Sequence, residues 1–228
     1  MAGTDQATLS AYRRAALPSP PTPWRDASFA VIDLETTGLD PAADEIIAFA
    51  TVTVRRGRVQ PGDATYRLVR PATMPGAESI RIHGLRPTDL EDAPPLPEVL
   101  GELLRGITGK VLVAHAAELE ERFLGAAFER DGIVLRGPAV DTAALALELW
   151  KRSRRRFRSI RGTGLSELAR SLGLPVHRPH QADGDALTTA QVFVALACHL
   201  DSRRPQTVGS LTELPRRLNA WQRLFQRN

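Results

Sequence analysis

Cysteine is almost absent from the sequence, which contains only Cys198 among its 228 residues. An intrachain disulfide is therefore impossible, and a zinc cluster held by several thiolates is excluded. Because Cys198 lies in the apolar run VFVALACHL, we expect it to be a residue of the hydrophobic core.

Long apolar runs are also missing from the chain. No run approaches the roughly 18 residues that a membrane-spanning helix needs. Residues 1–21 lack the continuous apolar segment that is typical of a signal peptide. We therefore expect a cytoplasmic protein with no membrane partner.

Lysine is the third scarce residue, since only Lys110 and Lys151 accompany the arginines among 30 basic residues. The net charge of +4 permits a nucleic-acid partner, although a coding bias toward arginine and alanine explains it equally well. The strongest charge cluster is the arginine-rich segment 151–161. Two interpretations of it stay open, namely a track for a phosphate backbone or a solvated basic loop.

The composition changes twice along the chain. Residues 1–27 hold four prolines within six positions and predict a loosely ordered, Pro-rich N-terminal arm. Residues 28–200 carry the alternating apolar pattern of the main domain. Residues 201–228 predict a basic amphipathic C-terminal helix with one apolar stripe.

Within the main domain, the apolar runs predict strands first and then strands alternating with helices. We expect strands at 29–34, 46–54, 65–70, 110–115 and 137–141, and helices at 95–105, 117–130, 142–150, 165–174 and 183–200. This order predicts an α/β fold with a mixed central sheet flanked by helices.

Two acids stand on the first predicted strand, in the stretch VIDLETTGLD. Asp33 and Glu35 are two residues apart, so both side chains leave the same face of the strand. Carboxylates on a buried strand repel each other and are costly to desolvate, and a divalent cation resolves both problems. The pair therefore predicts a metal site, and an exposed edge strand is the alternative.

A second group of candidate residues lies in the stretch PVHRPHQADGDALTTA. His180 and Asp185 form an H-x-A-x-x-D pattern where a loop enters a helix. An acid is also favourable in the first turn of any helix, so Asp185 alone has an ordinary explanation. A histidine beside a metal site is, however, well placed to deprotonate a bound water.

These motifs, in this order, resemble the DEDDh family of 3′→5′ exonucleases. The similarity covers about residues 28–200 and includes D-x-E-T-T-G, a strand ending in V-A-H, the I-H-G element of SIRIHGL, and H-x-A-x-x-D. The resemblance implies a ribonuclease-H-like exonuclease fold and two divalent cations, Mg²⁺ or Mn²⁺. It also implies that Asp33, Glu35 and Asp185 are metal ligands and that His180 is the general base.

The fourth carboxylate departs from the family pattern, in which the middle motif reads H-N-A-x-F-D. Here the same frame runs from His115 to Glu120, with alanine at Ala116 in place of asparagine. We expect Glu120 to complete the metal site, because it flanks the apolar stripe of its helix. The alternative is a surface acid and an incomplete catalytic set. The loss of asparagine removes hydrogen bonds either at the substrate or at the start of the helix.

Other polar residues are candidates for binding the substrate or for local structure. His83 is expected near the terminal nucleotide by resemblance, and a local hydrogen bond is an equal alternative. Asp141 is expected to cap a helix rather than to bind metal. The predicted substrate-binding residues are Thr36, Thr37, Gly38, His83 and His115.

These observations together predict a metal-dependent 3′→5′ exonuclease that releases nucleoside 5′-monophosphates. The expected partners are the 3′ ends of single-stranded nucleic acid, with DNA preferred, and the candidate protein partner is a DNA polymerase subunit. The alternatives are an RNA-trimming enzyme of the same family, or a nucleic-acid-binding scaffold protein with weakened catalysis.

Overall fold

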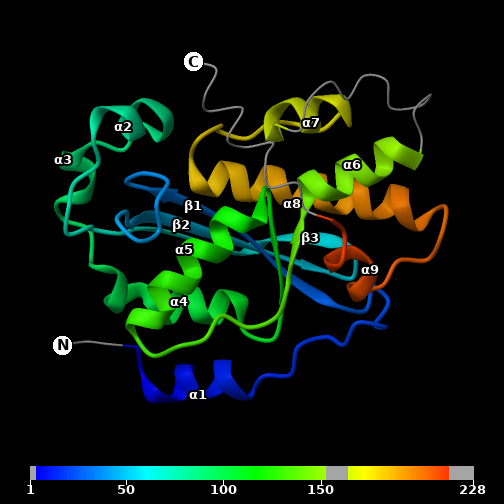
Figure 1. The fold of residues 1–228 in the computed structure, drawn as a ribbon, viewed down its shortest axis with the longest axis horizontal. Helices are drawn as coiled ribbons and strands as arrows, with labels where there is room; N and C mark the ends of the chain where they lie inside the picture. Colours follow the sequence, from blue (N-terminus) through cyan, green and yellow to red (C-terminus); the bar gives the residue numbers. More distant parts are fainter. Residues whose placement is uncertain (1–3, 153–163, 216–228) are drawn as a thin grey trace.

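The structure is a computed structural model that describes residues 4–152 and 164–215 (Figure 1). Most of the arginine-rich segment 151–161 lies outside the described residues, and so do residues 216–228 of the expected C-terminal helix. The expectation of one helix is wrong for the described residues 202–215, where only Val208–Thr212 are helical.

A five-stranded sheet in the order β3-β2-β1-β4-β5 forms the centre of the domain. Its strands are β1 (Ser28–Thr36), β2 (Ile46–Arg55), β3 (Arg58–Leu68), β4 (Val111–Ala114) and β5 (Ala139–Asp141). The first three strands form an antiparallel meander, whereas β4 and β5 run parallel to β1. The mixed sheet that the sequence predicts is therefore confirmed.

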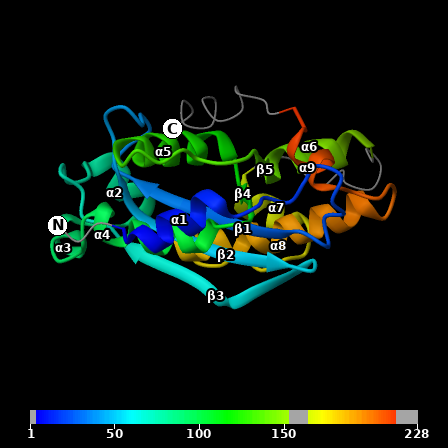
Figure 2. The same cartoon turned by 90° about the horizontal axis from the view of Figure 1, so that it is seen from below.

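Helices surround this sheet and connect its strands. They are α1 (Gln6–Arg14), α2 (Ala77–His83), α3 (Pro87–Leu90), α4 (Leu96–Ile107), α5 (Ala117–Arg130), α6 (Thr142–Arg152), α7 (Leu165–Ser171), α8 (Ala182–Asp201) and α9 (Val208–Thr212). The long helix α8 runs along the sheet in Figure 1, and β3 forms the edge of the sheet farthest from α5 in Figure 2.

Alternation along β1 divides the core into two parts. Phe29 and Val31 belong to the cluster that contains the apolar face of α8, whereas Ala30 and Ile32 belong to the cluster formed with α4 and α5. Side chains alternate along a strand, so Asp33 continues the α8 side. Asp33, the first acid of the candidate site, therefore follows Phe29 and Val31 on the same buried face of β1.

The third strand is longer than the sequence predicts, because it starts at Arg58 and includes Pro61. Proline cannot donate a hydrogen bond to a sheet ladder and is tolerated mainly on edge strands. Because β3 is an edge strand, Pro61 interrupts no second ladder. The pattern of the predicted strand 65–70 captured only the C-terminal half of β3.

The N-terminal arm is packed against the domain, so the expectation of loose order is wrong for residues 4–27. Helix α1 lies beside α4 (Figure 1), and Tyr12 and Trp24 are 4% and 1% exposed. Arg136 fastens the end of α1 by donating hydrogen bonds to the carbonyl oxygens of Tyr12 and Ala15, at 2.6 and 2.7 Å. The boundary of the arm at residue 27 stays a prediction.

Cys198 is half-buried and packs against the edge of the core cluster that contains α8, and its Sγ accepts a hydrogen bond from Arg25 at 3.4 Å. No helix in the described part of the chain is both long and apolar enough to span a membrane.

Candidate active site

The first two acids of the site lie where β1 extends beyond β4. The parallel pairing of these strands reaches only Val31 and Val113, so Asp33 and Glu35 stand past its end, at the carboxyl edge where α/β folds commonly bind ligands. On the other side of β1, in its antiparallel pairing with β2, Asp33 lies opposite Ala50 and Glu35 lies opposite Ala48. These small side chains permit α8 to approach the sheet closely.

Asp185 enters from the first turn of α8, and its carboxylate accepts a hydrogen bond from the backbone N–H of His180 at 2.8 Å. His180 itself is exposed and has a φ of 60°. The loop before α8 folds back over Gly184, where a Cβ would lie 2.5 Å from the carbonyl oxygens of His177 and Arg178. Glycine at this position therefore allows the loop to hold His180 beside Asp185.

Glu120 enters from the first turn of α5 and is buried, with 8% exposure. The backbone N–H of Leu34, between Asp33 and Glu35 in the chain, donates a hydrogen bond to the Glu120 carboxylate. This bond docks Glu120 onto the acidic end of β1. The placement that the sequence predicts for Glu120 therefore agrees with the structure, whereas its role as a ligand stays a prediction.

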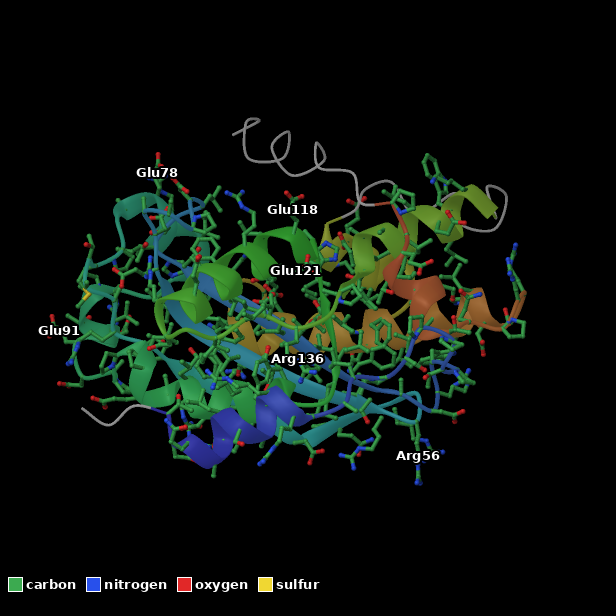
Figure 3. The ribbon with its side chains drawn as sticks, turned by 60° about the horizontal axis from the view of Figure 1, so that its bottom comes forward. Arg56, Glu78, Glu91, Glu118, Glu121 and Arg136 are labelled. Carbon is green, nitrogen blue, oxygen red and sulfur yellow. The ribbon has the colours of Figure 1, made fainter. Side chains whose placement is uncertain are left out.

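The neighbouring acids of α5 point elsewhere. Glu118 lies on the outer side of the helix in Figure 3. Glu121 accepts a hydrogen bond from the backbone N–H of Ala139 at 3.1 Å and so ties α5 to β5. Of the three acids in this turn, only Glu120 reaches the cluster.

Burial and mutual repulsion disfavour the ionised forms of these acids. Burial first, and then the charges of Glu120, Glu35 and Asp185, raise the pKa of Asp33 well above its ordinary value. Burial together with the charge of Asp185 raises the pKa of Glu35 to about 8. Burial and the charge of Glu35 raise the pKa of Glu120 to about 8, against the opposing effect of the Leu34 hydrogen bond.

The pKa of Asp185 is also raised, although part of the rise is offset by His180. Burial raises its pKa, while the hydrogen bond and the charge of His180 lower it. The same chain of interactions links Asp33, Glu35, Glu120 and Asp185 into one electrostatic unit. Four acids that cannot all ionise together form a binding site for positive charge.

Divalent cations fit this donor set, because hard cations prefer carboxylate oxygens. Glu35 supplies a specific observation, since its Oε1 is buried and makes no hydrogen bond to any described residue. No three His, Cys, Asp or Glu side chains in residues 4–152 and 164–215 already surround a single point as metal ligands. The four acids are therefore gathered at one end of β1 without three of them already surrounding a common point.

Ala116 lies at the start of α5 with a φ of 62°, in the left-handed region. Its backbone N–H donates to Asp141 Oδ1 at 3.0 Å, and the same oxygen accepts a hydrogen bond from Ala143 at 2.8 Å. Asp141 is thus the cap of α6, as the sequence predicts. The asparagine of the family motif would occupy the N-cap of α5, where asparagine both tolerates this conformation and caps a helix.

Two predicted substrate residues are buried histidines. His115 is 8% exposed, and its Nδ1 lies 2.8 Å from Thr142 Oγ1, which links β4 to α6. His83 ends α2 with 5% exposure, and its Nδ1 accepts a hydrogen bond from Leu85 at 3.0 Å. His83 can keep this local hydrogen bond and still contact a substrate, because its other ring nitrogen, Nε2, is buried without a partner among the described residues.

In the turn after β1, the side chains that the sequence predicts to bind substrate form hydrogen bonds within the loop itself. The Thr36 hydroxyl donates to the carbonyl oxygen of Gly38, and the Thr37 hydroxyl donates to Asp44 at 3.0 Å. A Cβ at Gly38 would lie 2.4 Å from the Asp44 carboxylate, so a larger residue there would displace the side chain that Thr37 contacts. These residues shape the edge of the acidic site, and their contact with a nucleotide stays a prediction.

Sequence reasoning missed Tyr66, which lies on β3 opposite Ala50 and therefore shares the face of Asp33. Burial first, and then the charges of Asp183 and Glu35, raise the pKa of its phenol. No local motif marks Tyr66, because its position depends on the register of two strand pairs.

Comparisons with known proteins agree with this geometry. The chain is 36% identical over 170 residues to a DNA polymerase III PolC-type protein of Thermotoga maritima, covering 74% of this chain and 12% of that protein. It is 34% identical over 197 residues to a DNA polymerase III subunit epsilon-like protein of Rhodobacter capsulatus, covering 85% of this chain and 27% of that protein. The chain thus spans only a small part of these relatives.

Solved structures share the fold at low sequence identity. Exonuclease X in complex with 5′ overhanging duplex DNA matches with a TM-score of 0.63 and 22% identity, over 82% of this chain and 98% of that chain. E. coli Exonuclease I in complex with a dT13 oligonucleotide matches with a TM-score of 0.66 and 15% identity, over 88% of this chain and 43% of that chain. The ribonuclease-H-like exonuclease fold is therefore confirmed.

A family model described as an exonuclease, RNase_T, matches residues 30–193. These bounds enclose Asp33, Glu35, Glu120 and Asp185, together with His180. As the resemblance to the DEDDh enzymes predicts, the chain belongs to this family of exonucleases.

Proposed function

We propose that the protein is a metal-dependent 3′→5′ exonuclease that hydrolyses the terminal phosphodiester bond and releases nucleoside 5′-monophosphates. The observation that carries the proposal is the convergence of four acids, from β1, α5 and α8, whose pKa values are all raised. Such a cluster is unfavourable by itself, which supports a role in holding cations.

In this proposal Asp33, Glu35, Glu120 and Asp185 hold two divalent ions, Mg²⁺ or Mn²⁺. When bound, such a pair polarises the scissile phosphate and acidifies an attacking water. The acids lie on three regular elements, β1, α5 and α8, which hold them near one another before the substrate arrives.

His180 accepts the proton of the attacking water in this scheme. Its exposed ring suits a group that must meet both solvent and substrate. Its backbone is held in a left-handed conformation by the hydrogen bond to Asp185. The residue that would bind metal therefore also positions the general base.

The substrate end is proposed to lie over the turn of Thr36, Thr37 and Gly38 and beside α2. His83 is the contact with the best structural support, because its buried Nε2 has no partner in the described part of the chain. The Nδ1 atom already accepts a hydrogen bond, which favours a proton on Nε2 that can be donated to a nucleotide. His115 is proposed to support the site through Thr142.

DNA is the proposed substrate, and a DNA polymerase subunit in the cytoplasm is the proposed partner. Relatives named as DNA polymerase III proteins support both statements, and the fold is shared with exonucleases solved with DNA. RNA trimming is the second candidate within the family. A scaffold without turnover is disfavoured, because the Leu34 hydrogen bond holds Glu120 in the cluster despite its departure from the family's aspartate.

The test is a substrate panel at equal enzyme concentration with Mn²⁺. It compares single-stranded DNA, mismatched duplex, RNA and a dinucleotide, each labelled at the 5′ or the 3′ end. We expect mononucleotides from the 3′ end, with DNA digested fastest, and no product in EDTA. Asp33→Asn should lower the rate by roughly 10²–10³-fold, the scale of losing one electrostatic stabiliser, while Glu118→Gln should not. Undiminished digestion by Asp33→Asn would exclude this site.

A further inference from the structure

The β2–β3 hairpin ends in an unusually basic turn at the opposite end of β2 from the acidic site. Arg55 pairs directly with Arg58, and Arg56 and Gly57 form the two-residue loop. Their φ angles are 54° and 66°, as in a type I′ turn. We refer to residues 55–58 as the arginine turn.

The residues of the arginine turn are unfavourable for the stability of this turn conformation. Type I′ loops favour asparagine, aspartate or glycine, and a left-handed conformation costs other residues such as Arg56 about 1–2 kcal/mol. Like charges directly opposite each other, as in Arg55 and Arg58, cost up to about 1 kcal/mol more. Local strain of this kind points to a function when the structure retains it.

The arginine turn also surrounds a hollow. Arg55, Arg56 and Arg58, together with Gln60, line an open space of about 570 Å³. Arg55 is held by Asp63 at 2.7 Å, but neither Arg56 nor Arg58 forms an ion pair with a described residue. Figure 3 shows Arg56 pointing away from the body of the protein. Two guanidinium groups are thus exposed beside a space that is large enough for a phosphate group.

We infer that the arginine turn binds the phosphodiester backbone of the nucleic acid whose 3′ end occupies the acidic site. This inference rests on the proposed function, which supplies the polyanion. Exposed guanidinium groups bind phosphate through bidentate hydrogen bonds. A backbone contact needs no base sequence, which suits an enzyme that must process every end.

The length of β1 sets the shortest substrate that can use both places. Arg55 pairs with Ser28, five residues before Asp33. At ~3.3 Å per residue the separation is about 17 Å, several times the ~3.4 Å axial spacing of successive phosphates in a stacked strand. A dinucleotide, whose single internucleotide phosphate lies at the acidic site, therefore cannot reach the arginine turn, whereas a 20-mer can.

Counterion release gives the size of the expected effect. Each phosphate contact with a single strand contributes a slope of about −0.7 to the plot of log K against log salt. Two contacts correspond to a slope change of about 1.4 and to about 25-fold tighter binding at 0.1 M than at 1 M salt. The inference therefore predicts a large, salt-dependent effect on long substrates only.

The experiment compares the wild type with Arg56→Asn/Arg58→Thr, which relieves the strain and the repulsion of the turn. A charge-matched control, Arg13→Gln/Arg14→Gln, removes two exposed arginines from α1. Binding of a fluorescent single-stranded 20-mer and of a dinucleotide is measured in EDTA between 0.05 and 0.5 M salt, and thermal unfolding is recorded. Binding in EDTA is independent of turnover, so a failure of the inference is distinguishable from a failure of the proposed function.

We expect the turn variant to be at least as stable as the wild type, to bind the 20-mer up to about 25-fold more weakly at 0.1 M salt, and to bind the dinucleotide unchanged. Equal losses in the turn variant and the α1 control would overturn the inference in favour of bulk charge. Unchanged binding of the 20-mer would also overturn it. A variant that loses binding only to anionic phosphatidylglycerol vesicles would reassign the turn to a membrane surface and contradict the inference.

Discussion

Replacing Glu120 by glutamine should make the metal-free protein more stable and less active at the same time. The side chain keeps its size, and its amide oxygen can still accept the hydrogen bond from Leu34. The substitution removes only the buried charge. Stability and activity are therefore expected to move in opposite directions.

The size of the effect follows from the pKa of Glu120, which rises from 4.5 to about 8 in the folded protein. An acid with a raised pKa binds its proton more tightly when folded, so wild-type stability falls as the pH rises between these two values. At ~1.4 kcal/mol per pH unit, the penalty is on the order of 4 kcal/mol at pH 8 and about 1 kcal/mol at pH 5. Glu120→Gln should remove this pH-dependent penalty.

Urea unfolding in EDTA at pH 5, 6.5 and 8 measures this directly. We expect Glu120→Gln to exceed the wild type by several kcal/mol at pH 8 and by little at pH 5. Glu118→Gln, in the same turn of α5, is the matched control and should show no such gain. Mn²⁺ should stabilise the wild type more than Glu120→Gln. Equal stability of Glu120→Gln and wild type at pH 8 would refute the placement of this carboxyl among the other acids.

Three further substitutions test how the scaffold supports the site. Ala116→Asn should raise the free energy of unfolding by about 1 kcal/mol, because asparagine tolerates the left-handed region and caps α5; a loss in urea unfolding would contradict this. Gly184→Ala should lower the free energy of unfolding by roughly 1–3 kcal/mol through overpacking, and it should lower kcat by displacing His180. An unchanged kcat would argue against a role of Gly184 in positioning His180. Trp24→Ala should cost about 3–5 kcal/mol in thermal unfolding, since Trp24 packs against Phe193 at a ring distance of 6.0 Å; no loss would mean that the N-terminal segment is not part of the core.

The sequence predicts most of the regular elements because their apolar periods are strong. The helix predicted at 117–130 has these same bounds in the structure, and the helix at 183–200 differs by one residue at each end. Helix α1 was missed because the prolines after it suggested a loose arm, whereas burial of Tyr12 and Trp24 depends on contacts with distant segments. Tertiary packing, which no local pattern contains, decided the structure of the arm.

The site was predictable as far as residue spacing determines it. Asp33 and Glu35 follow from strand alternation, and the position of Glu120 follows from its helix stripe. Tyr66 could not be placed, because a register shift between Thr51 and Thr53 changes which residue of β3 lies opposite Ala50. The hydrogen bond from Leu34 to Glu120 was equally hidden, since it joins a strand to a helix far along the chain.

The most direct test of the central claim is anomalous diffraction from crystals soaked in Mn²⁺ with deoxythymidine 5′-monophosphate, a nucleotide of the proposed product class. The four gathered acids predict two Mn²⁺ peaks, roughly 3.5–4 Å apart as in other two-metal sites. Both peaks should lie among Asp33, Glu35, Glu120 and Asp185, with the 5′-phosphate of the nucleotide beside them. Peaks bound elsewhere on the protein, or no peak beside Asp33 at saturating Mn²⁺, would contradict the account.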